Sequence, residues 1–199
     1  EMVVVNDLNR VNMYMTGARS ANYGTMRATG KTKEELFAMN ATTPSNDALS
    51  ALQADTVMMF NVVNLIFLEL SSPQLEIILR QQISFTTTEP DEIRNACYDG
   101  CLGDINKWWM QYARENRIPH DAMHYITGNI VSRYVGVAYQ TTICRPRYSG
   151  AVTVAAGKDK NGLYYVGQTW NDIVTIAHEM GHHIGFPHDH DGSSNIAGL

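Results

Sequence analysis

The strongest constraint on this chain is one stretch near its C-terminus, residues 173–189, which reads IVTIAHEMGHHIGFPHD. At about 100° per residue, its apolar side chains fall on one narrow stripe of a predicted helix, whereas His178 and His182 lie together on the far side. Two imidazoles four residues apart can reach a single tetrahedral zinc ion at about 2.0–2.1 Å. The apolar stripe consists of Ile173, Ile176, Ala177, Met180 and Ile184. The sequence therefore predicts a helix that packs on one face and presents metal ligands on the other.

A third ligand has to come from outside that helix, and His188 is the candidate. If the helix continued, His188 would lie roughly 9 Å further along the axis than His182, too far to share an ion. Gly185 can adopt the left-handed conformation that ends a helix, and Pro187 prevents the helix from resuming. Because these helix breakers stand between the second and third histidines, we expect the chain to turn back and bring His188 to the pair.

Glu179 follows directly after the first predicted ligand, so its side chain points about 100° away from that of His178 and lies beside the metal rather than on it. Zinc lowers the pKa of a bound water toward about 7, and a carboxylate at this place can take the proton of that water. The pattern predicts a hydrolytic site with an open coordination position, because a structural zinc site would be closed by a fourth side chain. A zinc class with glutamate as the third ligand is excluded, since no glutamate follows Glu179.

The remaining histidines are predicted to stay off the metal. His183 falls near the apolar stripe, as a packed or hydrogen-bonded residue, and His190 is a solvent-exposed neighbour. His120 and His124 lie on or beside a predicted strand and have no ligand partner at a suitable spacing.

Composition indicates one domain, residues 1–199, with a buried core. The chain has 199 residues, of which 44% are hydrophobic and 18% charged, and a formal net charge of −5. A mildly acidic chain without a cluster of Lys and Arg excludes a nucleic-acid partner. The longest apolar run, Thr56 to Leu70, is interrupted by Asn61 and Asn64 and is shorter than the roughly 20 residues of a membrane crossing. We therefore expect a buried helix there and no membrane insertion.

The other elements place the chain in the α/β class, because helices and strands interleave. Strands are predicted at 3–5, 75–85, 124–127, 133–139 and 151–155, and a helix capped by Asp104 carries Trp108 and Trp109. We expect both tryptophans to pack in the core; stacking on a sugar or another ligand is the alternative. Residues 6–47 contain several glycines and scattered polar residues, and they predict a long loop with one short helix over 33–39.

The cysteine count bears on the compartment. Cys97, Cys101 and Cys144 make an odd number, which leaves one thiol without an internal partner. Two arrangements stay open for Cys97 and Cys101: a bridge around the short turn between them, or two free thiols. The tripeptide that begins at Asn40 is an acceptor for N-glycosylation and favours a secreted protein.

Taken together, these motifs resemble a known family. The pattern HExxHxxGxxH followed by Asp189 is similar to the metzincin zinc endopeptidases, and Asp189 resembles their adamalysin, or reprolysin, branch. That branch includes venom and salivary metalloproteases and the catalytic domains of related membrane-anchored shedding enzymes. Upstream, residues 119–128 and 136–144 are similar to two strands of that family, and 3–5 and 60–64 to its first strand and first helix. The resemblance implies a twisted mixed sheet with an antiparallel edge strand, packed helices and a long active-site helix. It also implies a secreted, monomeric, zinc-dependent endopeptidase of the venom or salivary type that cleaves extended peptide or protein substrates.

The resemblance also implies a role for each matching residue. Glu179 would be the catalytic base, Thr175 would line the pocket just beyond the cut bond, and Asp189 would form structural hydrogen bonds. The implied zinc ligands are His178, His182 and His188. The residues implied to pair with the substrate backbone in antiparallel fashion are Gly136, Val137, Ala138 and Tyr139.

Two departures from the family pattern concern the C-terminus. The family places a turn with a methionine below the zinc, and this sequence reaches Leu199 without it, so the C-terminal subdomain is expected to be truncated. Cys144 resembles a position that pairs with a cysteine beyond the third histidine, which would account for the odd count.

The main competing interpretation is a non-catalytic, zinc-binding homologue that acts by protein interaction, and the presence of Glu179 disfavours it.

Overall fold

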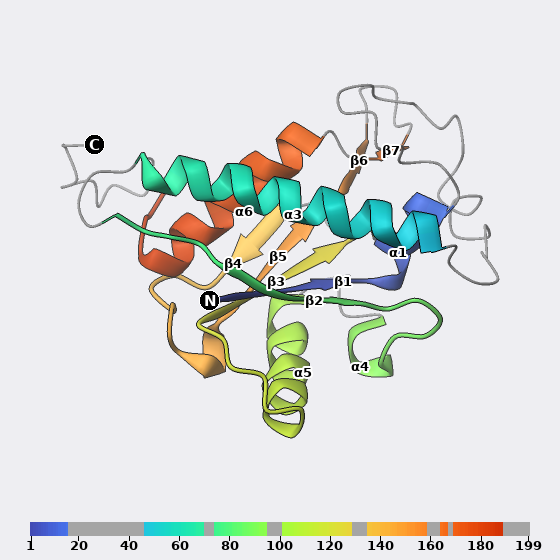
Figure 1. Cartoon of the computed structure of the whole chain (residues 1–199). Coiled ribbons are helices and arrows are strands. Elements are labelled where there is room, and N and C mark those ends of the chain that lie inside the picture. Colours follow the sequence, from blue (N-terminus) through green and yellow to red (C-terminus); the bar gives the residue numbers. More distant parts are fainter. Residues whose placement is uncertain are drawn as a thin grey trace.

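The computed structural model describes residues 1–15, 46–69, 74–94, 101–128, 135–158, 164–166 and 169–188. Its centre is a five-stranded sheet in the order β2-β1-β3-β5-β4 (Figure 1). The strands are β1 (Met2–Asn6), β2 (Leu79–Ser84), β3 (Ala122–Thr127), β4 (Gly136–Ala138) and β5 (Gly150–Val154). β1 is parallel to β2 and β3, β3 is parallel to β5, and β4 is antiparallel to β5. This mixed sheet with an antiparallel edge strand confirms the architecture that the family resemblance implies.

Helices cover both faces of this sheet. α3 (Asn46–Leu68) and α6 (Thr169–Ile184) lie together on one face, and α5 (Cys101–Glu115) lies on the other (Figure 1). Successive residues of β1 alternate between the two cores, because Val4 packs with α3 and α6 whereas Val3 and Val5 pack with α5. Since β1 is buried on both faces, its residues 2–5 are all apolar instead of alternating with polar ones.

Two predicted helices are confirmed, with earlier starts. The apolar run predicted to begin at Thr56 belongs to α3, which begins at Asn46. By length and composition alone α3 could cross a membrane, but one side of it is buried in the domain core, namely Leu52, Met59, Phe60, Val63 and Phe67. The predicted cap at Asp104 is wrong, because α5 begins at Cys101 and Asp104 lies inside its first turn. Trp108 and Trp109 are 8% and 0% exposed, which confirms that they pack in the core.

The predicted strands have the right places, with shifted ends. The strand predicted over 75–85 is limited to β2, and the one predicted over 133–139 ends at Ala138, with residues 133–134 outside the described part. The sequence predicted no element where α1 (Leu8–Met15) and α4 (Asp91–Arg94) form. A short 3-10 helix, Pro146–Tyr148, and the antiparallel pair β6 (Ala156–Lys158) and β7 (Tyr164–Val166) were not predicted either. The helix predicted over 33–39 lies outside the described residues.

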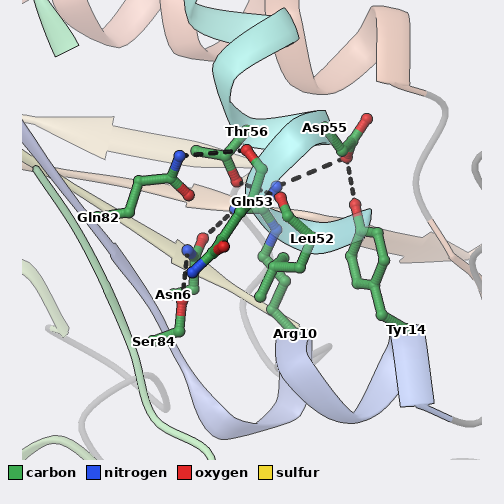
Figure 2. Close-up of polar contacts among 9 residues, drawn as sticks. All are labelled: Asn6, Arg10, Tyr14, Leu52, Gln53, Asp55, Thr56, Gln82 and Ser84. Carbon is green, nitrogen blue, oxygen red and sulfur yellow. Dashed lines mark hydrogen bonds and ion pairs between the residues drawn. The ribbon is translucent and has the colours of Figure 1, made fainter. Parts of the chain in front are cut away.

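Polar tertiary contacts hold α1 in place. Asp7 caps the helix, since its Oδ1 accepts the backbone N–H of Arg10 at 2.6 Å. Figure 2 shows the buried Arg10 guanidinium between Asn6, to which it donates, and Asp55 of α3, whose Oδ2 lies 3.7 Å from its Nη2. The Tyr14 hydroxyl also donates to Asp55. This buried ion pair with added hydrogen bonds joins α1 to α3, and it explains why a carboxylate occupies the buried side of α3.

Candidate metal centre and active site

Helix α6 presents its two motif histidines as the sequence predicts. Ile173, Ile176 and Met180 are buried in the core that α6 shares with α3 and the sheet. His178 is exposed on the other side of the helix, and His182, one turn later, is 6% exposed. Their Nε2 atoms lie 3.1 Å apart. The packing of the apolar stripe therefore fixes the direction in which both imidazoles point.

The helix ends where the glycine predicts. Gly185 has a φ of +103°, a region that favours glycine, and its N–H donates to the carbonyl of His182 at 2.9 Å. The N–H of Phe186 donates to the carbonyl of Gly181 at 2.9 Å. These two bonds form a Schellman motif, the usual C-terminal cap with glycine just past the last helical residue. The chain reverses at this point and carries His188 back toward α6.

The reversal completes a group of three imidazoles. The Nε2 atom of His188 lies 3.1 Å from that of His178 and 3.0 Å from that of His182. Nitrogens that bind a tetrahedral zinc at about 2.0–2.1 Å are separated by about 3.3–3.4 Å, so the group fits one zinc ion with shifts of a few tenths of an ångström. Among the described residues, no fourth His, Cys, Asp or Glu joins the three. The donor set is that of a catalytic zinc site with an open position.

Neighbouring groups keep the ligands in the form that binds a metal. Nδ1 of His182 donates to the carbonyl oxygen of Phe186 at 2.7 Å, which fixes the ring and leaves the Nε2 lone pair for the ion. Partial burial of the ring, together with the neighbouring His182 and His188, lowers the pKa of His178 and favours its neutral imidazole. The sequence gives no signal for the Phe186 carbonyl, because the interaction depends on the backbone turn and not on the side chain.

Glu179 lies beside the triad in a dry environment. Its side chain is 4% exposed and lies against Gly136, the first residue of β4, and not against the core side of α6. Burial raises the pKa of its carboxyl to about 7. A carboxyl held next to the metal ligands is placed to accept a proton and later release it, which is what general acid–base catalysis requires.

The edge strand lies next to this carboxylate. β4 is the last strand of the sheet, and Gly136 is opposite Thr153 of β5. Val154 donates its N–H to the carbonyl of Val135 at 2.8 Å, and hydrogen-bonded pairs alternate along an antiparallel ladder. Val137 is therefore the next residue bonded to β5, and the backbone groups of Gly136 and Ala138 point away from the sheet. They face the side on which another extended strand can add.

Thr175 lies beside Gly136 and Glu179, whereas Tyr139 lies just beyond the end of β4. The Thr175 methyl lies beside Gly136, so the residue is on the helix surface that β4 crosses. Tyr139 follows the last residue of β4, and its carbonyl accepts the Thr142 hydroxyl at 3.1 Å. β4 ends at Ala138, one residue before the predicted end, because at Tyr139 the chain begins the turn that leads to the end of α6.

Among the described residues, His120, His124 and His183 do not belong to the triad. His183 is 3% exposed, which confirms packing, and burial lowers its pKa to about 4. His124 is fully buried in β3, where its Nε2 lies 2.8 Å from the Thr153 hydroxyl, and burial lowers its pKa to about 3. His120 accepts the indole N–H of Trp109 at 2.9 Å.

Several predicted features fall at or beyond the limits of the described residues. Asp189, His190 and Cys97 lie outside the described part of the chain. The Cys101 side chain is not described either, so the structure does not test its pairing with Cys97. Cys144 is an exposed, free thiol.

Comparison with known proteins agrees with this geometry. A family profile described as metallo-peptidase family M12 matches residues 34–198. The chain belongs to metallopeptidase family M12. Disintegrin and metalloproteinase domain-containing protein 15 from Homo sapiens is 37% identical over 79 residues, which cover 39% of this chain and 8% of that protein. The same protein from Rattus norvegicus is 32% identical over 108 residues, which cover 54% of this chain and 12% of the relative.

The fold of this M12 metallopeptidase is also found among solved structures. A chain in one described as "Structure of a chaperone-substrate complex" aligns with 98% of it at a TM-score of 0.60 and 16% identity, over 24% of that other chain. At this identity the likeness concerns the fold alone. M12 peptidases are zinc-dependent hydrolases of peptide bonds, and the histidine triad of this chain fits the zinc site that they need.

Proposed function

We propose that this M12 metallopeptidase is an endopeptidase that hydrolyses internal peptide bonds of protein substrates, with Glu179 as the general base. The observation that carries the proposal is one arrangement at the C-terminal end of α6. Three Nε2 atoms lie 3.0–3.1 Å from one another, and the buried carboxyl of Glu179 comes from the residue directly after the first of them. Two of the three metal ligands and the proton acceptor thus share one helix, and His188 joins them from the turn that follows it.

In this proposal the three histidines bind the metal and Glu179 transfers the proton during peptide-bond hydrolysis. His178, His182 and His188 would hold the zinc ion, which would supply Lewis acidity for the scissile carbonyl and for the attacking water. Glu179 accepts a proton from the attacking water as the new carbon–oxygen bond forms. It then gives that proton to the amine nitrogen as the carbon–nitrogen bond breaks. The buried position of Glu179 keeps this proton away from bulk solvent.

The edge strand supplies the substrate platform in this proposal. An extended peptide would pair in antiparallel fashion with the outward backbone groups of Gly136 and Ala138, and Tyr139 would follow at the end of the strand. Thr175, beside Gly136 on α6, would line the pocket just beyond the cut bond. Backbone pairing makes few demands on the substrate sequence, so side-chain preference would come from such pockets.

Two substitutions test the assignment in the complete, zinc-loaded protein. Glu179→Gln keeps the shape of the side chain but removes its basicity, so we expect bound zinc to be retained and turnover of a denatured protein substrate to fall by about 10²- to 10⁴-fold. His182→Ala should lose both zinc and turnover. Glu92→Gln on the exposed surface of α4 is the matched control and should keep both.

The outcomes separate the proposal from its competitor. Unchanged turnover in Glu179→Gln would refute the general base, and cleavage that survives chelation would refute the dependence on zinc. Zinc binding without cleavage by the complete chain would instead favour a non-catalytic protein that acts by interaction.

We also propose that the protein acts outside the cell, as a secreted enzyme of the venom or salivary type. The glycosylation acceptor at Asn40 and the resemblance of the zinc motif support this proposal. Expression of the full-length gene in a secreting cell should yield protein in the medium, with a glycan that peptide N-glycosidase removes. Full-length protein that stays in the cytosol with reduced cysteines would contradict it.

A further inference from the structure

β4 and α6 approach each other closely at Gly136. A Cβ added to Gly136 would lie 2.5 Å from Oε1 of Glu179, 2.8 Å from its Cγ and 2.7 Å from Cγ2 of Thr175. All three distances are under 3.0 Å, which real Cβ atoms essentially never show. The carboxylate and the second side-chain carbon of Glu179 therefore lie in space that any other residue at position 136 would fill.

Neither backbone can easily give way to such a Cβ. Gly136 is held in the ladder opposite Thr153, and β5 is paired on its other side with β3. On α6, Ile176 is 0% exposed in the core between the helix and the sheet. The segment after β4 also ties the strand to the end of the helix, since the N–H groups of Thr141 and Thr142 donate to the carbonyls of His182 and His183 at 2.9 Å each.

We propose that Gly136 is a positioning residue for Glu179, in addition to any backbone contact with substrate. Because residue 136 has no side chain, the backbone of β4 packs directly against the Glu179 carboxylate. This contact fixes the carboxylate beside the zinc ligands. The inference rests on the proposed function, because it gives Gly136 a catalytic consequence only if Glu179 is the base. A displacement of about 1 Å in a reacting group costs on the order of 100-fold in rate.

A pure substrate contact predicts a different result from a positioning role. Alanine keeps the N–H and C=O groups of residue 136. If this residue only pairs its backbone with the substrate, the substitution can act only by shifting the strand, and the shift would change KM. A positioning role acts on the proton acceptor after the substrate is bound. The substitution should then lower kcat and leave KM and zinc content near their wild-type values.

The test compares Gly136→Ala with the wild-type, zinc-loaded protein. We expect kcat to fall about 100-fold with one zinc still bound. Gly103→Ala is the matched control, because the nearest atom to its added Cβ is the Tyr139 hydroxyl at 3.9 Å, and it should leave kcat unchanged. In the Glu179→Ala background both atoms of residue 179 that meet the new Cβ, Oε1 and Cγ, are absent, so Gly136→Ala should cost little of the activity that remains.

A crystal structure of the Gly136→Ala protein gives a readout that does not depend on activity. We expect the Glu179 carboxylate to be displaced while the backbones of β4 and α6 superpose on the wild type. The inference is overturned if Glu179 keeps its place and the strand moves, if only KM changes, if zinc is lost, or if the fold-loss of kcat is equal in the Glu179→Ala background. A wild-type protein that fails to cleave refutes the proposed function instead, and the displacement of Glu179 still decides the structural claim.

Discussion

Replacement of Gly185 by alanine tests how the third ligand is placed. Gly185 has a φ of +103°, and the Schellman motif around it turns the chain toward His188. A non-glycine residue held in such a conformation costs about 1–3 kcal/mol. Alanine recovers about 0.4–1 kcal/mol by restricting the unfolded chain. We therefore expect Gly185→Ala to lower the free energy of unfolding of the zinc-free protein by about 1–2 kcal/mol.

The same substitution should weaken zinc binding. A Cβ on Gly185 would lie 3.3 Å from the Thr141 hydroxyl, so relaxation of the turn moves the carbonyl of Phe186, which holds the His182 ring through Nδ1. Loss of such an outer hydrogen bond costs about 10- to 100-fold in metal affinity. Urea unfolding of the zinc-free protein measures the change in the free energy of unfolding. Competition with a chromophoric chelator measures the change in zinc affinity.

Gly103→Ala is the control, because it makes the same chemical change with the opposite expected sign. Gly103 lies on the exposed side of α5, where alanine is favoured over glycine by about 0.5–1 kcal/mol. Zinc affinity should not change. A Gly185→Ala protein that matches the wild type in stability and zinc affinity would refute the argument that this turn depends on a positive φ.

Two further predictions concern the core. His124 has a pKa of about 3 in the fold against an ordinary 6.5, so the unfolded chain binds more protons and stability falls as the pH drops below 6.5. Between pH 6.5 and 5 this loss of stability is about 1.5 kcal/mol, and urea titrations should show a smaller loss in His124→Gln. An equal loss in the variant would contradict the assignment of this pH dependence to His124. Ile176→Ala should cost about 2–5 kcal/mol by leaving a cavity, whereas Val174→Ala, at a residue 47% exposed, should cost under about 0.5 kcal/mol in the same titration.

The metal ligands could be predicted from the sequence because their geometry is local. His178 and His182 are one helical turn apart, and the turn at Gly185 is made by backbone hydrogen bonds within five residues. Such bonds form in nearly the same way wherever the helix sits in a fold. The spacing of three histidines and the glycine between them therefore predicted the triad, and the 3.0–3.1 Å distances agree with it.

Several element boundaries could not be predicted, because their residues are polar and their partners are distant in sequence. The first turns of α3 carry Asp55 on a buried side, which a hydrophobic pattern treats as the outside of the helix. Only the contacts with Arg10 and Tyr14 of α1 make that position stable (Figure 2). Helix α1 depends on the same contacts, so both its presence and the start of α3 were missed together.

The sequence by itself determined which atoms can bind a metal and which carboxyl follows them, because a helix and its cap are set by neighbours along the chain. The tertiary structure alone decided what lies against that carboxyl. Periodicity shows which side of α6 is buried, but it carries no information about which strand crosses the other side. The burial that raises the pKa of Glu179, and the contact with Gly136, exist only because the sheet places its edge strand there.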